Sequence, residues 1–271
     1  MPRTILAISS QVARGSVGLS VITPALQMLG ATVIALPTVL LSNHPGHGAF
    51  AGRRTEVDLL SQMRRALDDN GWLDTVDTVL SGYLPSAAHV EFVAETVALV
   101  RRTRQACRYI CDPVLGDDPK GLYIEAPAAA AIRDRLLALA DVVLPNRFEL
   151  AWLSGRPADS MADTVAAARQ LAPPQVIATS IPTGSGSLAT LAVTRTTAVA
   201  CSVERRRGVA NGTGDLLSAF IAGGWSLGRA VAAIDAVITA SAGHDELQLA
   251  QSRAAWIEAA PLAEVPVDAG P

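Results

Sequence analysis

The run Asn211-Gly212-Thr213-Gly214-Asp215 is the part of the sequence best suited to chemistry on a phosphoryl group. Its glycines let backbone amides converge without obstruction by side chains. The apolar segment 216–220 that follows predicts a helix, whose free N–H groups and positive dipole end would face the turn and bind an anion. Asp215 could then accept the proton of an attacking hydroxyl. The alternative is a tight turn in which Asp215 only favours the start of the helix.

Two further polar groups follow predicted strands. Asn146 and Glu149 are three residues apart, so they share one face of a first helical turn, where they could hold Mg²⁺ or its water shell. The same spacing fits a capping box with Asn146 as the N-cap and Glu149 closing it. Asp112 lies in Cys111-Asp112-Pro113, where it could bind a cation or a nucleotide phosphate, or be only a polar strand terminus.

The segment 41–55 is long enough for a binding loop or lid. It contains Ser42-Asn43-His44 and His47, which are too few ligands for a metal site, so polar contacts to a small substrate or mere solvation remain. No Gly-x-x-x-x-Gly-Lys-Ser/Thr run is present, which excludes a P-loop kinase. Gly15-Ser16-Val17-Gly18 follows the first predicted strand but lacks the full dinucleotide-binding spacing.

Short β-like runs alternate with helical patterns, an order that predicts an α/β fold with a mostly parallel sheet and helices on both faces. The predicted strands are 4–8, 31–36, 78–81, 109–111, 142–144, 175–179, 188–193 and 197–203. The predicted helices are 20–29, 59–70, 90–104, 126–139, 164–171, 214–224, 229–243 and 248–258. Such sheets bind ligands at the carboxyl ends of their strands, where Ser10, Asp112 and Asn146 would lie. We expect one domain over residues 1–258 and a flexible tail over 259–271.

The composition restricts the partners and the compartment. Hydrophobic residues make up 50% of the chain and charged residues 17%, which favours a large buried core. The net charge of −3 and a single short basic block, Arg205-Arg206-Arg207, indicate no nucleic-acid or membrane partner. The three cysteines fit neither a zinc site nor a disulfide framework, so we expect buried thiols. With no signal-peptide pattern and no apolar run of about 20 residues, we expect the cytoplasm.

Taken in order, these motifs resemble the ribokinase-like superfamily and, within it, the pyridoxal kinases, over 5–243. The matching segments are Ala7-Ile8-Ser9-Ser10 with Gly15 and Gly18, 38–44, Ser81-Gly82-Tyr83-Leu84, 111–117, Pro145-Asn146-x-x-Glu149 with Leu153-Ser154-Gly155-Arg156, and Gly212-Thr213-Gly214-Asp215. Each motif alone is weak, but the ordered set is specific. The resemblance implies a ribokinase-like fold and ATP-dependent phosphorylation of the 5′-hydroxymethyl group of pyridoxal, and of pyridoxine or pyridoxamine. It also implies Mg²⁺, a monovalent cation such as K⁺, and a homodimer.

The resemblance further implies roles for single residues. Asp215 would be the base, and Gly212, Thr213 and Gly214 would stabilise charge developing on the γ-phosphate. Asp112 and Glu149 would help to hold Mg²⁺ and the ATP phosphates. The other residues implied to contact ATP are Asp117, Tyr123, Thr179 and Ser180. Ser10 would hydrogen-bond the pyridine ring, and the residues implied to line the vitamin pocket are Val17, His44 and Tyr83.

The sequence departs from the family pattern at five positions, most of them near the substrate loop. Gln11 stands where the family usually has histidine, His47 where it often has tyrosine, and Asn211 where it has an apolar residue. Pro45 replaces a threonine and offers neither a side-chain donor nor a backbone N–H. Leu144 replaces a small or polar residue that helps to site a monovalent cation. These changes bear on which vitamer is preferred.

Two alternatives remain open. The first is a related kinase acting on hydroxymethylpyrimidine or on a sugar-like alcohol, although Ser9-Ser10 and Ser42-Asn43-His44 argue against a sugar. The second is a protein that binds a vitamer without turnover because the loop at Pro45 has changed. The intact Asp215 and its glycines argue against this second alternative.

Overall fold

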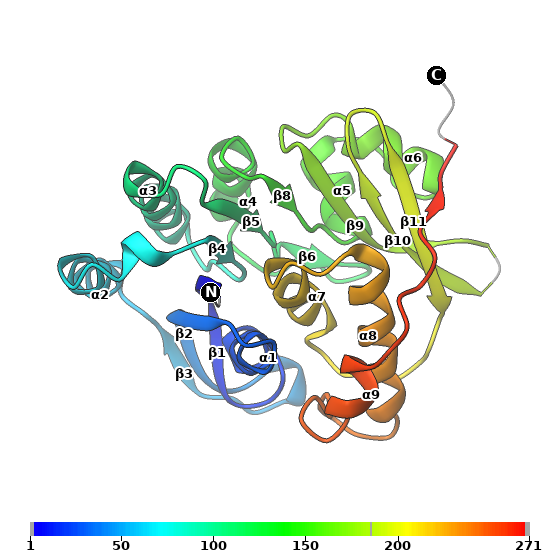
Figure 1. Ribbon diagram of the computed structural model, residues 1–271, viewed down its shortest axis with the longest axis horizontal. Coiled ribbons are helices and arrows are strands. Elements are labelled where there is room, and N and C mark those ends of the chain that lie inside the picture. Colours follow the sequence, from blue (N-terminus) through cyan, green and yellow to red (C-terminus); the bar gives the residue numbers. More distant parts are fainter. Residues whose placement is uncertain (1–2, 185, 269–271) are drawn as a thin grey trace.

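A ten-stranded sheet runs through the computed structural model, which describes residues 3–184 and 186–268 (Figure 1). The strand order is β12-β11-β10-β9-β8-β5-β4-β1-β2-β3. The bounds are β1 Thr4–Arg14, β2 Thr32–Asn43, β3 Gly52–Arg54, β4 Thr78–Ser81, β5 Arg108–Cys111, β8 Val142–Val143, β9 Gln175–Pro182, β10 Ser187–Val193, β11 Ala198–Glu204 and β12 Val265–Pro266. The strands from β9 to β2 in this order run parallel, and the outer strands are antiparallel. The predicted mostly parallel α/β sheet is therefore confirmed.

Alternate strand residues point to opposite faces of the sheet, and each face has its own core. Ile5 and Ala7 belong to one apolar cluster, whereas Leu6 and Ile8 belong to the other. The helices of the first cluster are α1 Leu19–Met28, α7 Thr213–Ala222, α8 Leu227–Ala240 and α9 Arg253–Ile257. Those of the second are α2 Val57–Asp69, α3 Ala87–Thr103, α4 Ala126–Ala131, α5 Arg147–Ser154 and α6 Met161–Ala168. Helices thus cover both faces, as the alternating pattern predicts (Figure 1).

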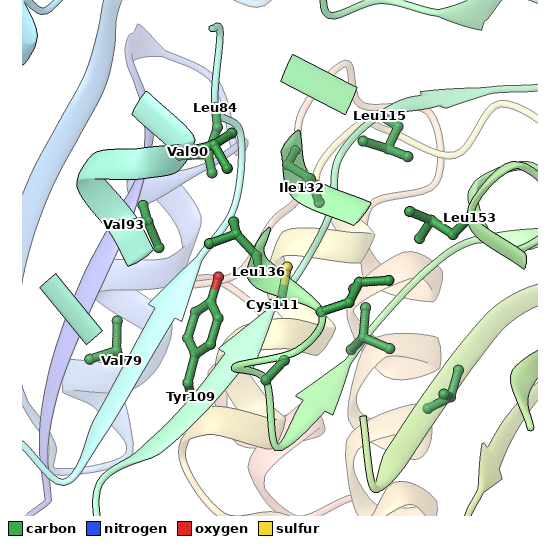
Figure 2. Close-up of a cluster of buried hydrophobic side chains, with 14 of the residues drawn as sticks. Val79, Leu84, Val90, Val93, Tyr109, Cys111, Leu115, Ile132, Leu136 and Leu153 are labelled. Carbon is green, nitrogen blue, oxygen red and sulfur yellow. The ribbon is translucent and has the colours of Figure 1, made fainter. Parts of the chain in front are cut away.

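The second cluster is centred on β5 and the helices that cover it (Figure 2). Tyr109 is fully buried, and its hydroxyl lies 2.7 Å from Ser81 Oγ, so the only polar atom of its side chain has a partner. Cys111 lies beside it on the same strand, and all three cysteines are buried and free. The prediction of buried thiols is confirmed. The ends of β4 and β5 therefore pack against a buried apolar core.

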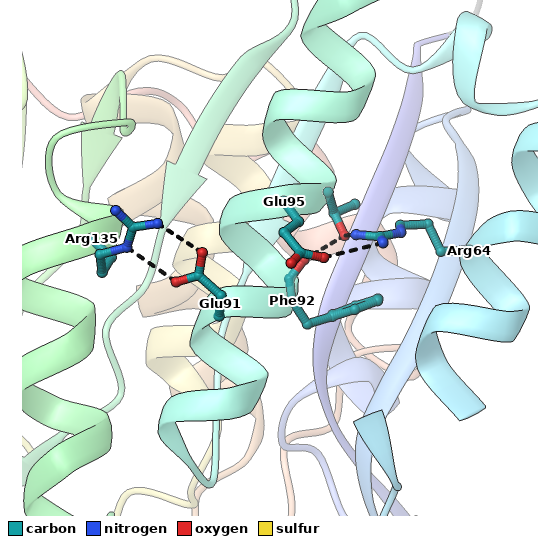
Figure 3. A network of polar contacts seen from close by, with 6 residues as sticks. Arg64, Glu91, Phe92, Glu95 and Arg135 are labelled. Atoms are coloured by element: carbon teal, nitrogen blue, oxygen red, sulfur yellow. Dashed lines mark hydrogen bonds and ion pairs between the residues drawn. The ribbon is translucent and has the colours of Figure 1, made fainter. Parts of the chain in front are cut away.

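Ion pairs on α3 link the helices of this face (Figure 3). Glu91 accepts two hydrogen bonds from Arg135, and Glu95 accepts one from Arg64. The Arg64 guanidinium also lies 5.1 Å from the ring centroid of Phe92. Because the Glu91 and Glu95 side chains are about half exposed, these pairs add little to stability and mainly set how the helices lie against α3.

Three segments differ from the sequence-based expectation. The predicted loop 41–55 is largely a hairpin: β2 continues to Asn43, a short 3₁₀ turn (η1, Pro45–His47) follows, and β3 pairs back onto β2. The predicted helix 126–139 changes after α4 into one π turn, η3 Ile132–Leu136. The predicted flexible tail is anchored, because β12 pairs with β11 and Val267 N donates to Ala198 O. Its residues 269–271 lie outside the described part of the chain.

Within the described residues, no helix has the length and apolar character needed to cross a membrane.

Candidate active site

The carboxyl ends of the parallel strands bring three acidic side chains to one place. Asp112 follows β5, Glu149 lies in the first turn of α5, and Asp215 lies in the first turn of α7. The pKa of Asp112 lies well above its ordinary value, first because the side chain is buried and then because the charges of Asp215 and Glu149 act on it. Ser218, one turn after Asp215 on α7, donates to Asp112 Oδ2 at 2.6 Å. The cluster is therefore tied together by a buried hydrogen bond.

The turn before α7 has the conformation that the glycines predict. Gly212 has φ +103°, and a Cβ at this position would lie 1.6 Å from the carbonyl oxygen of Ser16. Leu216 N donates to Gly212 O, so the helix begins directly after this glycine. Gly214 has nothing within 4 Å of a Cβ position and is open to a ligand. Space is therefore available beside the first turn of α7, as an anion-binding turn requires.

Asp215 lies where this turn meets the loop after β1. The backbone N–H of Gly18 donates to its carboxylate, and burial raises its pKa to about 6. Gly18 in turn packs against Ser10, since a Cβ on Gly18 would lie 2.2 Å from Ser10 O and 2.3 Å from Ser10 Oγ. A carboxyl with a pKa of about 6 is ionised at neutral pH and basic enough to receive a proton in a transition state.

The capping box at Asn146 and Glu149 is confirmed. Asn146 Oδ1 accepts from Glu149 N at 2.9 Å, and Glu149 Oε2 accepts from Asn146 N at 2.8 Å. Glu149 Oε1 also accepts from Leu115 N at 2.7 Å and from Gly116 N at 3.4 Å. Burial nevertheless raises the pKa of Glu149 to about 7. Both oxygens thus already bind backbone donors, and only their remaining lone pairs are available to a metal or its water shell.

The segment after β5 folds over these carboxylates. Val114 has φ +44°, which is rare for a β-branched residue, and its N–H donates to Asp112. The hairpin of β6 Gly116–Asp117 and β7 Gly121–Leu122 follows, with Asn146 Nδ2 donating to Gly116 O. The strain at Val114 therefore turns successive N–H groups towards Asp112 and Glu149.

The predicted nucleotide-binding residues lie on this hairpin and on the neighbouring strand. Asp117 Oδ1 is buried without a hydrogen-bond partner among the described residues, and Lys120 Nζ lies 3.6 Å from Asp117 Oδ2. Burial and then the charge of Glu149 raise the pKa of Tyr123, although 47% of the residue is exposed. Thr179 N donates to Pro145 O at 3.0 Å, and Ser180 follows with φ +63°. These residues border the same strand ends as the carboxylates.

The predicted vitamin-pocket residues come from the segment after β4, the loop before α1 and the tip of the β2–β3 hairpin. Tyr83 follows β4, where its N–H donates to Ser9 Oγ at 3.1 Å, and Val17 is buried in the loop before α1. His44 is the N-cap of η1, with Pro45 in the first position, and Asn211 Nδ2 lies 3.4 Å from His44 Nδ1. The hairpin β2–β3 therefore reaches the turn that carries Asp215.

Two of the family departures have structural partners. Gln11 Nε2 donates to Ser20 Oγ at 2.9 Å and so supports the start of α1. Leu144 follows β8 and is buried in the core shared by α1 and α7. The leucine side chain there offers no ligand atom to a cation.

Sequence reasoning missed several residues of the site. Ser218 is three positions after Asp215 on a predicted helix, so helical spacing could have placed it on the same face. Gly18 was identified only as part of a glycine pair, and nothing local indicated that its N–H would meet Asp215. The strained Val114 carries no sequence signal, because a valine at positive φ is not expected.

The carboxylates suit Mg²⁺ only in part. The described part of the chain contains no group of three or more His, Cys, Asp or Glu side chains placed to hold a metal by themselves. Magnesium is commonly held by one or two carboxylates with substrate phosphates and waters completing its shell. Asp112 has hard oxygen atoms with lone pairs beyond those used by Ser218 and Val114, so the site fits an ion that arrives with a nucleotide.

Comparisons with known proteins show what the whole chain is similar to. Residues 22–251 match the family described as phosphomethylpyrimidine kinase. The pyridoxal kinase PdxY of Leifsonia xyli subsp. xyli is 33% identical over 92% of this chain and 94% of its own. The pyridoxine/pyridoxal/pyridoxamine kinase of Bordetella avium is 35% identical over 84% of this chain and 81% of its own. The structure of Leishmania donovani pyridoxal kinase with ADP and pyridoxamine has a TM-score of 0.92 at 29% identity, covering 98% of this chain and all of that one.

Proposed function

Because the chain belongs to the phosphomethylpyrimidine kinase family and, within it, to the pyridoxal kinases, we propose that it phosphorylates the 5′-hydroxymethyl group of pyridoxal, pyridoxine and pyridoxamine with ATP. The observation that carries the proposal is Asp215 in the first turn of α7, beside a glycine turn in which Gly214 leaves open space among the described residues. The relatives bearing these names align with nearly the whole chain.

In this mechanism Asp215 accepts the proton of the vitamer's 5′-hydroxyl as the oxygen attacks the γ-phosphorus of ATP, and ADP leaves. The backbone N–H groups of 212–214 bind the oxygens of the transferring group, where charge develops. Asp112, and Glu149 through its remaining lone pairs, would hold Mg²⁺, which neutralises charge on the β- and γ-phosphates when bound. Gly18 orients the Asp215 carboxylate through its N–H.

The two substrates would enter from opposite sides of the carboxylate cluster. The residues assigned to ATP are Asp112, Asp117, Tyr123, Glu149, Thr179, Ser180, Gly212 and Gly214. The residues assigned to the vitamer are Ser10, Val17, His44, Tyr83 and Asp215. Two contacts support this division: Leu115, just before the β6–β7 hairpin, donates to Glu149, and His44, at the tip of the β2–β3 hairpin, contacts Asn211.

The direct test is ATP-dependent formation of pyridoxal 5′-phosphate by the purified protein with Mg²⁺ and K⁺. We expect turnover that stops when EDTA removes the metal and returns with added Mg²⁺. Asp215→Ala should lose about 10²–10⁴-fold in kcat while still binding ATP. Asp163→Ala is the control, since Asp163 lies on the remote helix α6. No turnover of any vitamer at millimolar concentration would refute the proposal.

A second candidate substrate is hydroxymethylpyrimidine, because the family match carries that name. It should be included in the same panel at the same concentrations. A kcat/KM for the pyrimidine above that for every vitamer would make this the function. Tight pyridoxal binding without turnover of any substrate would instead favour a binding protein.

We further propose a homodimer in the cytoplasm and activation by a monovalent cation. Related kinases motivate these three expectations. Light scattering measures the oligomeric state, and replacing K⁺ by tetramethylammonium measures the ion requirement. Because the Leu144 side chain offers no ligand atom, we expect a weaker dependence on K⁺ than a polar side chain there would give.

A further inference from the structure

A polar contact joins the tip of the β2–β3 hairpin to the phosphoryl-transfer turn. Asn211 Nδ2 lies 3.4 Å from His44 Nδ1, although the two residues are 167 positions apart. Asn211 directly precedes Gly212, so the contact sets His44 beside the turn that carries Asp215. The backbone N–H of Gly46 also donates to His44 Nδ1, at 3.1 Å. Two groups therefore converge on one ring nitrogen of His44.

These contacts fix the position of the imidazole proton. A backbone N–H can only donate, so His44 Nδ1 must carry a lone pair and no proton. The amide Nδ2 of Asn211 is also a donor and favours the same tautomer. Burial, followed by the charges of His47 and Lys120, lowers the pKa of His44, so the ring is neutral. The single proton of the neutral ring then lies on Nε2, which remains available as a donor.

We propose that the Gly46 N–H and Asn211 together hold His44 as its Nε2–H tautomer, and that the Nε2–H donor selects vitamers with an uncharged oxygen at C4 over the vitamer with an ammonium group there. The inference rests on the proposed function and extends it to the choice among substrates. The 5′-oxygen must meet Asp215, and on the pyridine ring the only polar substituent next to C5 is the one at C4. A donor beside the same turn therefore faces that substituent.

The three vitamers differ only in this group. The aldehyde oxygen of pyridoxal and the hydroxyl oxygen of pyridoxine can accept from Nε2–H, whereas the ammonium of pyridoxamine has only donors. A net hydrogen bond of ordinary strength corresponds to about a three- to tenfold preference. We therefore expect kcat/KM for pyridoxal and pyridoxine to exceed that for pyridoxamine by at least this factor.

The test is the ratio of kcat/KM for pyridoxal to that for pyridoxamine in matched variants. His44→Leu removes the Nε2–H donor and should reduce the ratio about three- to tenfold. Any damage to the anion-binding turn affects both substrates and cancels in the ratio. Ser42→Ala is the control, because it removes the bond from Ala51 N to Ser42 Oγ in the same hairpin without touching the His44 ring. An unchanged ratio in His44→Leu overturns the proposal.

The tautomer can be measured without activity. Imidazole ¹⁵N spectra, with the His44 signals assigned by their loss in His44→Gln, should show Nδ1 unprotonated and Nε2 protonated. A wild-type His44 protonated at Nδ1 overturns the proposal. If no vitamer is turned over, the proposed function fails, and the dissociation constants of pyridoxal and pyridoxamine decide this proposal by the same ratio.

Discussion

Replacing Gly212 by alanine should both destabilise the protein and stop phosphoryl transfer. At φ +103° an L-residue is strained by about 1–2 kcal/mol. The new Cβ would also lie 1.6 Å from Ser16 O, so the turn and the 15–18 loop must separate by more than about 1 Å. Overpacking of this kind costs about a further 1–3 kcal/mol. We expect a melting temperature lower by at least about 4 °C.

The catalytic effect follows from the same displacement. A shift of about 1 Å in the groups that position a reacting phosphoryl costs about 10²-fold in rate. Ser16 precedes Gly18, whose N–H orients Asp215, so the base and the anion-binding turn move together. The assay is kcat for pyridoxal phosphorylation, measured beside thermal unfolding of the same preparation. The expected result for Gly212→Ala is a loss of at least about 10²-fold in kcat together with the lower melting temperature.

Gly214→Ala is the matched control. Its Cβ meets nothing within 4 Å and its φ is not positive, so the variant should fold like the wild type. Alanine is a better helix former than glycine, and its melting temperature should be equal or slightly higher. Any loss of activity in this variant then comes from a clash with the bound phosphate. Wild-type melting temperature and kcat in Gly212→Ala would refute the reasoning for this turn.

Three other predictions concern the carboxylates and the core below them. Activity should fall as the pH drops through about 6, since burial raises the pKa of Asp215 to about 6 and only its ionised form accepts a proton. The raised pKa lowers the stability of the fold as the pH rises from the ordinary to the raised value, so Asp215→Asn should melt higher than wild type at pH 8 but not at pH 3.5. An equal gain in melting temperature at both pH values would contradict the assignment. Ser218→Ala should destabilise the fold by about 1.5–3 kcal/mol and move the acid limb of the pH–rate profile to higher pH, because Asp112 Oδ2 loses the hydroxyl that donates to it at 2.6 Å. An acid limb at the same pH would show that the ionisation of Asp112 does not affect the rate. Tyr109→Phe should lower the free energy of unfolding, measured by urea titration, by about 1–3 kcal/mol, because Ser81 loses the hydroxyl of Tyr109 as a partner. The value of kcat should not change, and a changed kcat would mean that the core around β5 influences the site.

The sheet could be predicted because its strands are short, buried and separated by helical periodicity. The predicted strand at 78–81 has the observed bounds, and those at 109–111 and 188–193 differ by one residue. The extension of β1 to Arg14 and of β2 to Asn43 was missed, since both strands run beyond the sheet core into half-exposed residues. The pairing of 265–266 with β11 depends on a contact far along the chain, which local propensity does not encode.

The site was predictable to the extent that it depends on local spacing. The turn at Asp215 and the cap formed by Asn146 and Glu149 could be predicted because turns and helix caps depend on residues that are close together in the sequence. The contacts of Ser218 with Asp112 and of His44 with Asn211 join distant segments, so they follow only from the fold. Pattern alone also left open whether Glu149 is a cap, which the structure resolves in favour of the cap while leaving its metal role a prediction.

Both edges of the ten-stranded sheet are closed by very short strands, the three residues of β3 and the two of β12. An open edge offers unpaired N–H and C=O groups on which another chain can add a strand, and short edges, cationic side chains and proline oppose this. Arg53 and Arg54 lie on β3, and Pro266 lies on β12. The segment 262–267 thus protects β11 from edge-to-edge aggregation, and a truncation that removed it would leave a seven-residue strand exposed along one side.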